Sequence, residues 1–154
     1  MSVSVKSFQR RVPVSLPRLR ALGQRALDAV GRGDRELHVS IVDDREIRRL
    51  HGRYLGARRA TDVIAFNLEG PPSSPLLGEV VISAETAARQ SREVGVPVAR
   101  ELDLLLVHGV LHLAGWDDHT PADAHRMHER AREILDAARR SPLRDRTWTG
   151  LLPT

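Results

Sequence analysis

Two histidines four residues apart are the residues of this chain best suited to metal-dependent chemistry. His108 and His112 lie in the apolar run 102–114, and on a helix this spacing puts both imidazoles on one face, one turn apart. That arrangement suits two ligands of one tetrahedral zinc ion. Because burying both histidines without partners would be costly, we favour a shared metal. His125 and His128, three apart on the last expected helix, could face this site, but we favour surface positions for them.

A third ligand is expected shortly after this pair. Gly115 allows a sharp turn, and Asp118 lies six residues beyond His112, the offset of the last histidine in the metzincin pattern. A carboxylate is an acceptable zinc ligand, whereas His119, one residue later, offers the imidazole of a three-histidine site. We predict Asp118 as the third ligand with His119 as the alternative, and whichever does not bind is expected to orient the other.

The residues around the site indicate which reaction it could catalyse. Three protein ligands leave a fourth position for water, and zinc lowers the pKa of bound water to about 7. Gly109 stands where H-E-x-x-H metalloproteases have their general-base glutamate, so peptide hydrolysis by that mechanism is disfavoured. Attack on a phosphodiester needs a cation near the developing charge. Arg59 is the predicted catalytic residue for this role, with Arg53 and Arg58 as alternatives.

The elements that hold these residues follow from the hydropathy pattern. Apolar residues alternate in the expected strands and recur every three or four positions in the expected helices. Asp43 or Asp44 is expected to cap the second helix, and Gly115 to end the fourth. Strands are expected at residues 2–8, 36–42, 60–67 and 77–83, and helices at residues 16–30, 45–55, 84–94, 98–113 and 121–140. The predicted fold is α/β (α+β), with about four strands in a mixed sheet, about five helices and a zincin-like metal site on a buried helix.

Length and composition indicate a single domain over residues 1–154, with a loosely held tail from about residue 141. Hydrophobic residues make up 41% of the chain, which suffices for one core. Cysteine is absent, which excludes disulfides and thiolate ligands. We find no signal peptide and no transmembrane segment, and therefore expect a cytoplasmic protein.

The net charge of +4 rests almost entirely on arginine, since Lys6 is the only lysine. Arginine suits bidentate contacts with phosphate, so a polyanionic partner is reasonable. A solvated, arginine-rich surface would explain the charge equally well. Aromatic residues make up only 3% of the chain, which argues against single-strand binding by stacking on aromatic rings.

The segment 108–117, HGVLHLAGWD, resembles the signature of the YbeY-type endoribonucleases, bacterial ribosomal-RNA maturation factors. Residues 61–66 and 77–83 are similar to two further segments of that family, so the resemblance covers about residues 36–136. It implies a mixed sheet, one Zn²⁺ per chain in a cleft, and single-strand-specific endoribonuclease activity. It also implies processing of the 3′ end of small-subunit rRNA and a role in ribosome quality control, with RNA as partner rather than DNA or a membrane.

Three departures from the family pattern keep other functions open. One extra residue precedes His119, Leu55 stands where many members have an arginine, and Ala65 and Asn67 replace a serine and a proline. The alternative function is a non-catalytic ribosome- or RNA-binding assembly factor with a structural zinc. A metalloprotease or other small-molecule hydrolase is a third possibility. The sequence leaves the oligomeric state open.

Overall fold

A computed structural model describes residues 3–54, 62–71 and 73–140. Its strands are β1 (Val3–Ser7), β2 (Glu36–Val42), β3 (Val63–Asn67) and β4 (Leu76–Ser83). Its helices are α1 (Leu16–Ala29), α2 (Asp44–Tyr54), α3 (Ala84–Val94), α4 (Val98–Leu113) and α5 (Pro121–Arg140). The predicted elements are therefore confirmed, and their observed ends differ from the predicted ones by a few residues at most. The predicted tail from about residue 141 lies outside the described residues.

The strands form one mixed sheet in the order β1-β2-β4-β3. β1 and β4 both run parallel to β2, whereas β3 runs antiparallel to β4. In this register Val5 pairs with Val39, and Val39 pairs with Val80. These valines are buried, as a face of a sheet covered by helices requires. The α/β fold with a mixed sheet, predicted from the hydropathy pattern, is confirmed.

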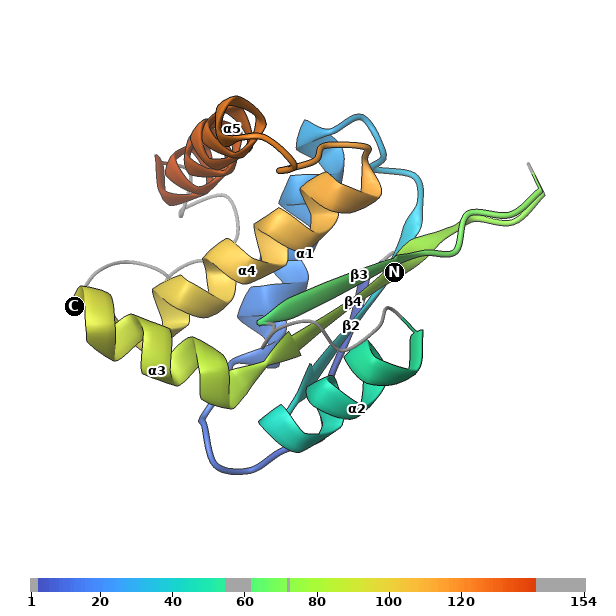
Figure 1. Cartoon of the computed structure of the whole chain (residues 1–154). Helices are drawn as coiled ribbons and strands as arrows, with labels where there is room; N and C mark the ends of the chain where they lie inside the picture. Colours follow the sequence, from blue (N-terminus) through green and yellow to red (C-terminus); the bar gives the residue numbers. More distant parts are fainter. Residues whose placement is uncertain (1–2, 55–61, 72, 141–154) are drawn as a thin grey trace.

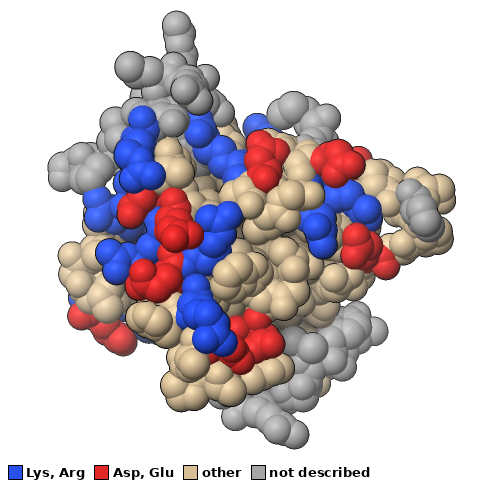
Figure 2. All heavy atoms as spheres, turned by 90° about the horizontal axis from the view of Figure 1, so that it is seen from above, with Lys and Arg blue, Asp and Glu red and all other residues tan. Residues whose placement is uncertain are grey.

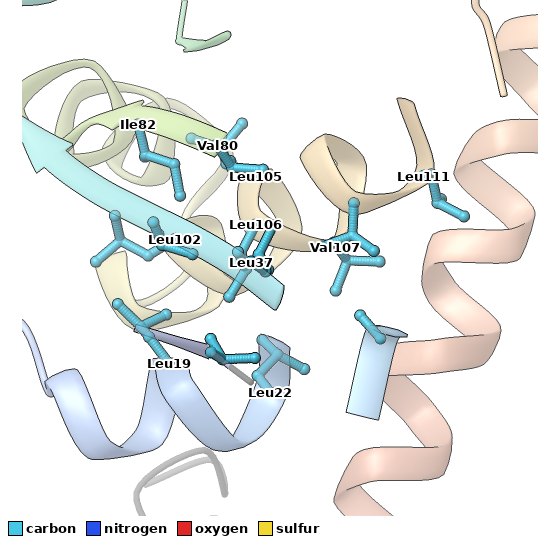
Figure 3. Close-up of a cluster of buried hydrophobic side chains, with 14 of the residues drawn as sticks. Leu19, Leu22, Leu37, Val80, Ile82, Leu102, Leu105, Leu106, Val107 and Leu111 are labelled. Atoms are coloured by element: carbon cyan, nitrogen blue, oxygen red, sulfur yellow. The ribbon is translucent and has the colours of Figure 1, made fainter. Parts of the chain in front are cut away.

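Helices cover the two faces of the sheet unequally (Figure 1). α4 packs on β3 and β4 and is flanked by α1, α3 and α5, whereas α2 packs on the opposite face. The main core lies between α1, α4 and the sheet, where side chains such as Leu22, Leu37 and Leu106 are fully buried (Figure 3). Burying one such side chain contributes roughly 1.5–3 kcal/mol. Among the described helices, none combines the length and apolarity needed to cross a bilayer.

The two aspartates at the start of α2 have different roles. Asp43 caps the helix, because its Oδ1 accepts a hydrogen bond of 2.8 Å from the Glu46 amide. Asp44 instead binds α3: it accepts hydrogen bonds from Ser83 (2.5 Å), Thr86 (2.6 Å) and Arg89 (2.6 Å). Partial burial raises the pKa of Asp44, but these bonds outweigh that effect and lower it to about 2. The carboxylate therefore stays charged and joins the two helices.

Candidate metal centre

His108 and His112 lie one turn apart on α4, as their spacing predicts, and both are partly buried. The Nε2 atom of His108 is buried and has no hydrogen-bond partner within the described part of the chain. Burial, His128 and His112 lower the pKa of His108, and Asp62 and Asp118 only partly oppose them. The imidazole is therefore neutral near pH 7, which is the form that binds a metal ion.

The second histidine is oriented by the turn that ends α4. The Nδ1 atom of His112 lies 3.2 Å from the Trp116 carbonyl oxygen. Because a carbonyl only accepts, Nδ1 carries the proton and Nε2 keeps its lone pair. Gly115, with φ +101°, permits the turn, and the Trp116 amide bonds back to the Leu111 carbonyl at 3.0 Å. This glycine-ended turn is the Schellman arrangement, and it positions the carbonyl that orients His112.

Gly109 explains sterically why no glutamate follows His108. A Cβ at this position would lie 2.5 Å from Val80 Cγ1 and 2.8 Å from Val80 Cγ2. α4 therefore approaches β4 too closely for any side chain at position 109. The position that carries the general base in H-E-x-x-H proteases faces the sheet here, so that mechanism has no place for its base.

The structure does not gather the predicted third ligand with the two histidines. Asp118 is exposed, but its charge acts on His108. The His119 side chain is 85% exposed, and its Nδ1 lies 3.8 Å from Asp117 Oδ1. Across residues 3–54, 62–71 and 73–140, no group of three or more His, Asp or Glu side chains is arranged to hold a metal ion. Asp118, with His119 as the alternative, therefore stays a prediction.

The predicted phosphate-stabilising arginines are not among the side chains that the structure describes. Arg58 and Arg59 lie outside the described residues, as does Leu55, and the side chain of Arg53 is not described. Both histidine Nε2 atoms nevertheless suit a zinc ion, which binds imidazole nitrogen. Nε2 of His108 has no hydrogen-bond partner in the described chain, and Nε2 of His112 keeps its lone pair because Nδ1 carries the proton. The residues present thus suit such an ion at two of its protein positions.

Several neighbours of His108 come from elements that its spacing pattern does not reveal. His128 of α5 lies with its ring centroid 6.2 Å from that of His108; it is exposed, as predicted, yet adjoins the centre. Asp62, just before β3, accepts a hydrogen bond of 3.1 Å from Gln90 Nε2 of α3. Glu101 lies two turns before His108 on α4. Burial raises its pKa, and the charge of Asp62 raises it further.

A pocket of about 580 Å³ opens beside His108, between α3, α4 and α5. Asp62, Gln90, Glu101 and His128 all line it. The family resemblance singles out the segments that contain Asp62 and His108, whereas Gln90, Glu101 and His128 lie outside those segments and reach the pocket through tertiary packing. The candidate centre thus has two histidines on one face of α4 and an adjoining pocket with acidic, basic and neutral polar groups.

Positively and negatively charged side chains are mixed on one face of this fold. On the face seen from above, blue and red side chains are interleaved (Figure 2). Ion pairs between nearby residues of α5 also alternate in sign along the helix: Arg130 lies 3.2 Å from Glu133, and Arg139 lies 3.4 Å from Asp136. Binding of a polyanion on that face would therefore depend on particular arginines rather than on a broad positive surface.

Sequence comparisons with known proteins agree on one family, and a solved structure shares the fold. The family model described as "Endoribonuclease YbeY" matches residues 4–139. A relative of that name from Anaeromyxobacter sp. strain Fw109-5 is 45% identical over 89% of this chain and 72% of its own length. Another, from Geobacter metallireducens, is 42% identical over 93% of this chain and 99% of its own length. The solution structure of TM1509 from Thermotoga maritima, 23% identical, shares the fold with a TM-score of 0.58 over 93% of this chain and 95% of that one.

Proposed function

Because this chain belongs to the YbeY family of endoribonucleases, we propose that it is a zinc-dependent endoribonuclease specific for single-stranded RNA. Its substrate is rRNA in the small ribosomal subunit, where it matures the 3′ end and contributes to ribosome quality control. It acts in the cytoplasm, where subunits are assembled. The observation that carries the metal part of this proposal is the buried Nε2 atom of His108, which has no hydrogen-bond partner in the described chain.

Zinc would be held by His108, His112 and a third ligand, Asp118 or His119. The Trp116 carbonyl supports this assignment because it holds the His112 ring with Nε2 free (Nδ1 to oxygen 3.2 Å). The low pKa of His108 supports it as well, since burial keeps that ring neutral. When bound, zinc supplies a water of lowered pKa and a Lewis acid for a phosphoryl oxygen.

The protein's own residues position the RNA and exclude competing chemistry. Gly109 keeps α4 against Val80, so no carboxylate side chain can project from that position toward the sheet. Arg132 lies on the outer side of the pocket that adjoins His108, and its guanidinium suits contacts with phosphate oxygens. Arg59 is proposed for the role of stabilising the charge that develops on the phosphate, as the sequence predicts.

Elemental analysis of the purified full-length chain, together with cleavage of a single-stranded RNA, tests this function. We expect about one zinc per chain, as in a three-ligand catalytic site. The substitution His108→Ala should abolish both zinc binding and cleavage. Of Asp118→Ala and His119→Ala, one should lose zinc and the other should retain it. Exposed His38 on β2 provides a matched control, because His38→Ala should keep both properties.

The same experiment separates the alternative, an RNA-binding assembly factor with a structural zinc. Loss of zinc in both Asp118→Ala and His119→Ala would indicate four protein ligands and a closed site. Two further results together would favour that alternative. The wild type would not cleave RNA, and His108→Ala would still bind ribosomal subunits in a salt-sensitive manner. Unchanged cleavage in His108→Ala would refute the proposed mechanism.

A further inference from the structure

Buried polar atoms without hydrogen-bond partners gather in the pocket beside His108. In the described part of the chain five such side-chain atoms occur, and three of them belong to residues that line this pocket. They are Gln90 Oε1, Arg100 Nε and His108 Nε2. The proposed zinc accounts for His108 Nε2 but not for the Gln90 and Arg100 atoms. Because a buried polar group without a partner is costly, these two atoms indicate a site whose partner is a ligand. The volume of about 580 Å³ lies within the usual range of ligand pockets, roughly 300–1,000 Å³.

One wall of the pocket presents hydrogen-bond acceptors. Asp62 accepts from Gln90 Nε2 at 3.1 Å, and this bond fixes the amide, since the opposite orientation would set two oxygens against each other. Gln90 Oε1 is therefore held as an acceptor. Glu101 adds a second carboxylate to the residues that line the same pocket as Asp62. A ligand at this wall must bring N–H or O–H donors, and a phosphate is disfavoured there by charge.

The rest of the pocket supplies an apolar surface and a donor. Leu104 and Leu105 of α4 line it with aliphatic carbon. Arg100 offers a buried Nε–H without a partner, which can donate to an acceptor on a ligand. Arg132, exposed on α5, lies at the outer side. A flat heterocycle with donors on one edge and an acceptor beside them matches this set of groups.

We propose that this pocket binds one unpaired guanine of the RNA, next to the phosphodiester that is cleaved. This inference rests on the proposed endoribonuclease function. The Watson–Crick edge of guanine carries two adjacent donor groups, N1–H and the 2-amino group, with the acceptor O6 beside them. The donors meet Gln90 and the carboxylate wall, and O6 meets Arg100. Adenine, cytosine and uracil each lack one of the two donors. The pocket is thus a specificity subsite for the base, separate from the ligands of the metal.

Binding of single nucleotides to the full-length chain tests the pocket without any cleavage. We expect GMP to bind about tenfold more tightly than IMP, which lacks only the 2-amino group, and than AMP or CMP. Gln90→Leu and Arg100→Met should each reduce GMP affinity by about tenfold. Gln24→Leu is the matched control, because Gln24 lies on α1 and bonds with Asp28 and Gly33. Equal affinities for the four nucleotides, or unchanged GMP affinity in both pocket variants, would overturn the proposal.

Cleavage assays distinguish failure of the pocket from failure of the proposed function. In cytidine-only RNA with one guanosine or one inosine, we expect wild-type cleavage beside guanosine to be about tenfold faster than beside inosine. Gln90→Leu should remove this difference. Equal rates of wild-type cleavage beside guanosine and inosine would refute the guanine subsite but would still support the proposed endoribonuclease function. Selective GMP binding without any RNA cleavage would support the subsite and refute the endoribonuclease.

Discussion

Gly109 of α4 lies against Val80 of β4 so closely that a Cβ at position 109 would come within 2.5 Å of Val80 Cγ1. This contact fixes how near α4 comes to the sheet. His108 is the preceding residue of the helix, so the same contact helps to fix its direction toward the pocket between α3, α4 and α5. The approach of one helix to one strand thereby sets the position of a candidate metal ligand.

Enlarging Gly109 should push α4 away from the sheet. Gly109→Ala is expected to lower the free energy of unfolding by about 1–3 kcal/mol through overpacking, measured by urea denaturation. Val80→Ala removes the two methyl groups involved, so the double variant should recover part of the loss. Gly52→Ala, in an exposed part of α2, is the control and should not destabilise. Simple additivity of the two penalties would contradict this account.

The turn at Gly115 should affect zinc affinity through the Trp116 carbonyl. Gly115 has φ +101°, so Gly115→Ala strains the backbone and displaces the acceptor of His112 Nδ1. Zinc affinity, measured by competition with a chelator, should fall about tenfold or more. Gly95→Ala carries a similar backbone strain at φ +74° at the end of α3, and it should leave zinc affinity unchanged. Equal losses in both variants would show a general effect of reduced stability.

Asp103 should make the protein less stable as the pH rises from about 4 to 7. Burial raises its pKa to about 7, and Arg18, 4.0 Å away, only partly opposes this effect. The unfolded carboxyl titrates near about 3.9, so between these values the folded state binds more protons. Stability is therefore full below pH 4 and is lost as the pH rises through about 7, by at most about 4 kcal/mol.

The substitution Asp103→Asn measures this contribution. The variant keeps a neutral side chain at every pH, so its free energy of unfolding should rise relative to the wild type between pH 5 and pH 8. Urea denaturation at both pH values gives the difference. Asp34→Asn, at an exposed position, should show no such change. If Asp103→Asn instead weakens relative to the wild type at pH 8, the charged pair with Arg18 is net stabilising.

Asp44 should have the opposite dependence on pH. Its pKa is lowered to about 2 in the folded state, so its contribution is present above about pH 4 and is lost as the pH falls toward 2. Asp44→Ala should cost about 1–2 kcal/mol at pH 7, because hydrogen bonds from Ser83, Thr86 and Arg89 lose their acceptor. The difference from the wild type should shrink at pH 2.5 in the same urea assay. If the variant and the wild type differ by the same free energy of unfolding at pH 7 and pH 2.5, the loss comes from packing and not from the charge of Asp44.

Local features of the sequence determined the elements and the histidine pair. Periodicity over a few residues predicted every strand and helix, because backbone hydrogen bonding and the direction of side chains repeat locally. Gly115 and Asp43 marked a helix end and a helix start for the same reason. The spacing of His108 and His112 sufficed to put them on one face of a helix.

Tertiary structure alone decided what surrounds those histidines. The residues that line the pocket come from four different parts of the chain, and their proximity depends on how these parts pack. Asp62 precedes β3, Gln90 lies on α3, Glu101 on α4 and His128 on α5. The reason that no side chain fits at position 109 also appears only when α4 meets β4. Contacts between residues far apart in the chain follow from filling one core at close-packed density. A single sequence carries no spacing rule for such contacts, so the pocket beside the two candidate metal ligands is visible only in the folded protein.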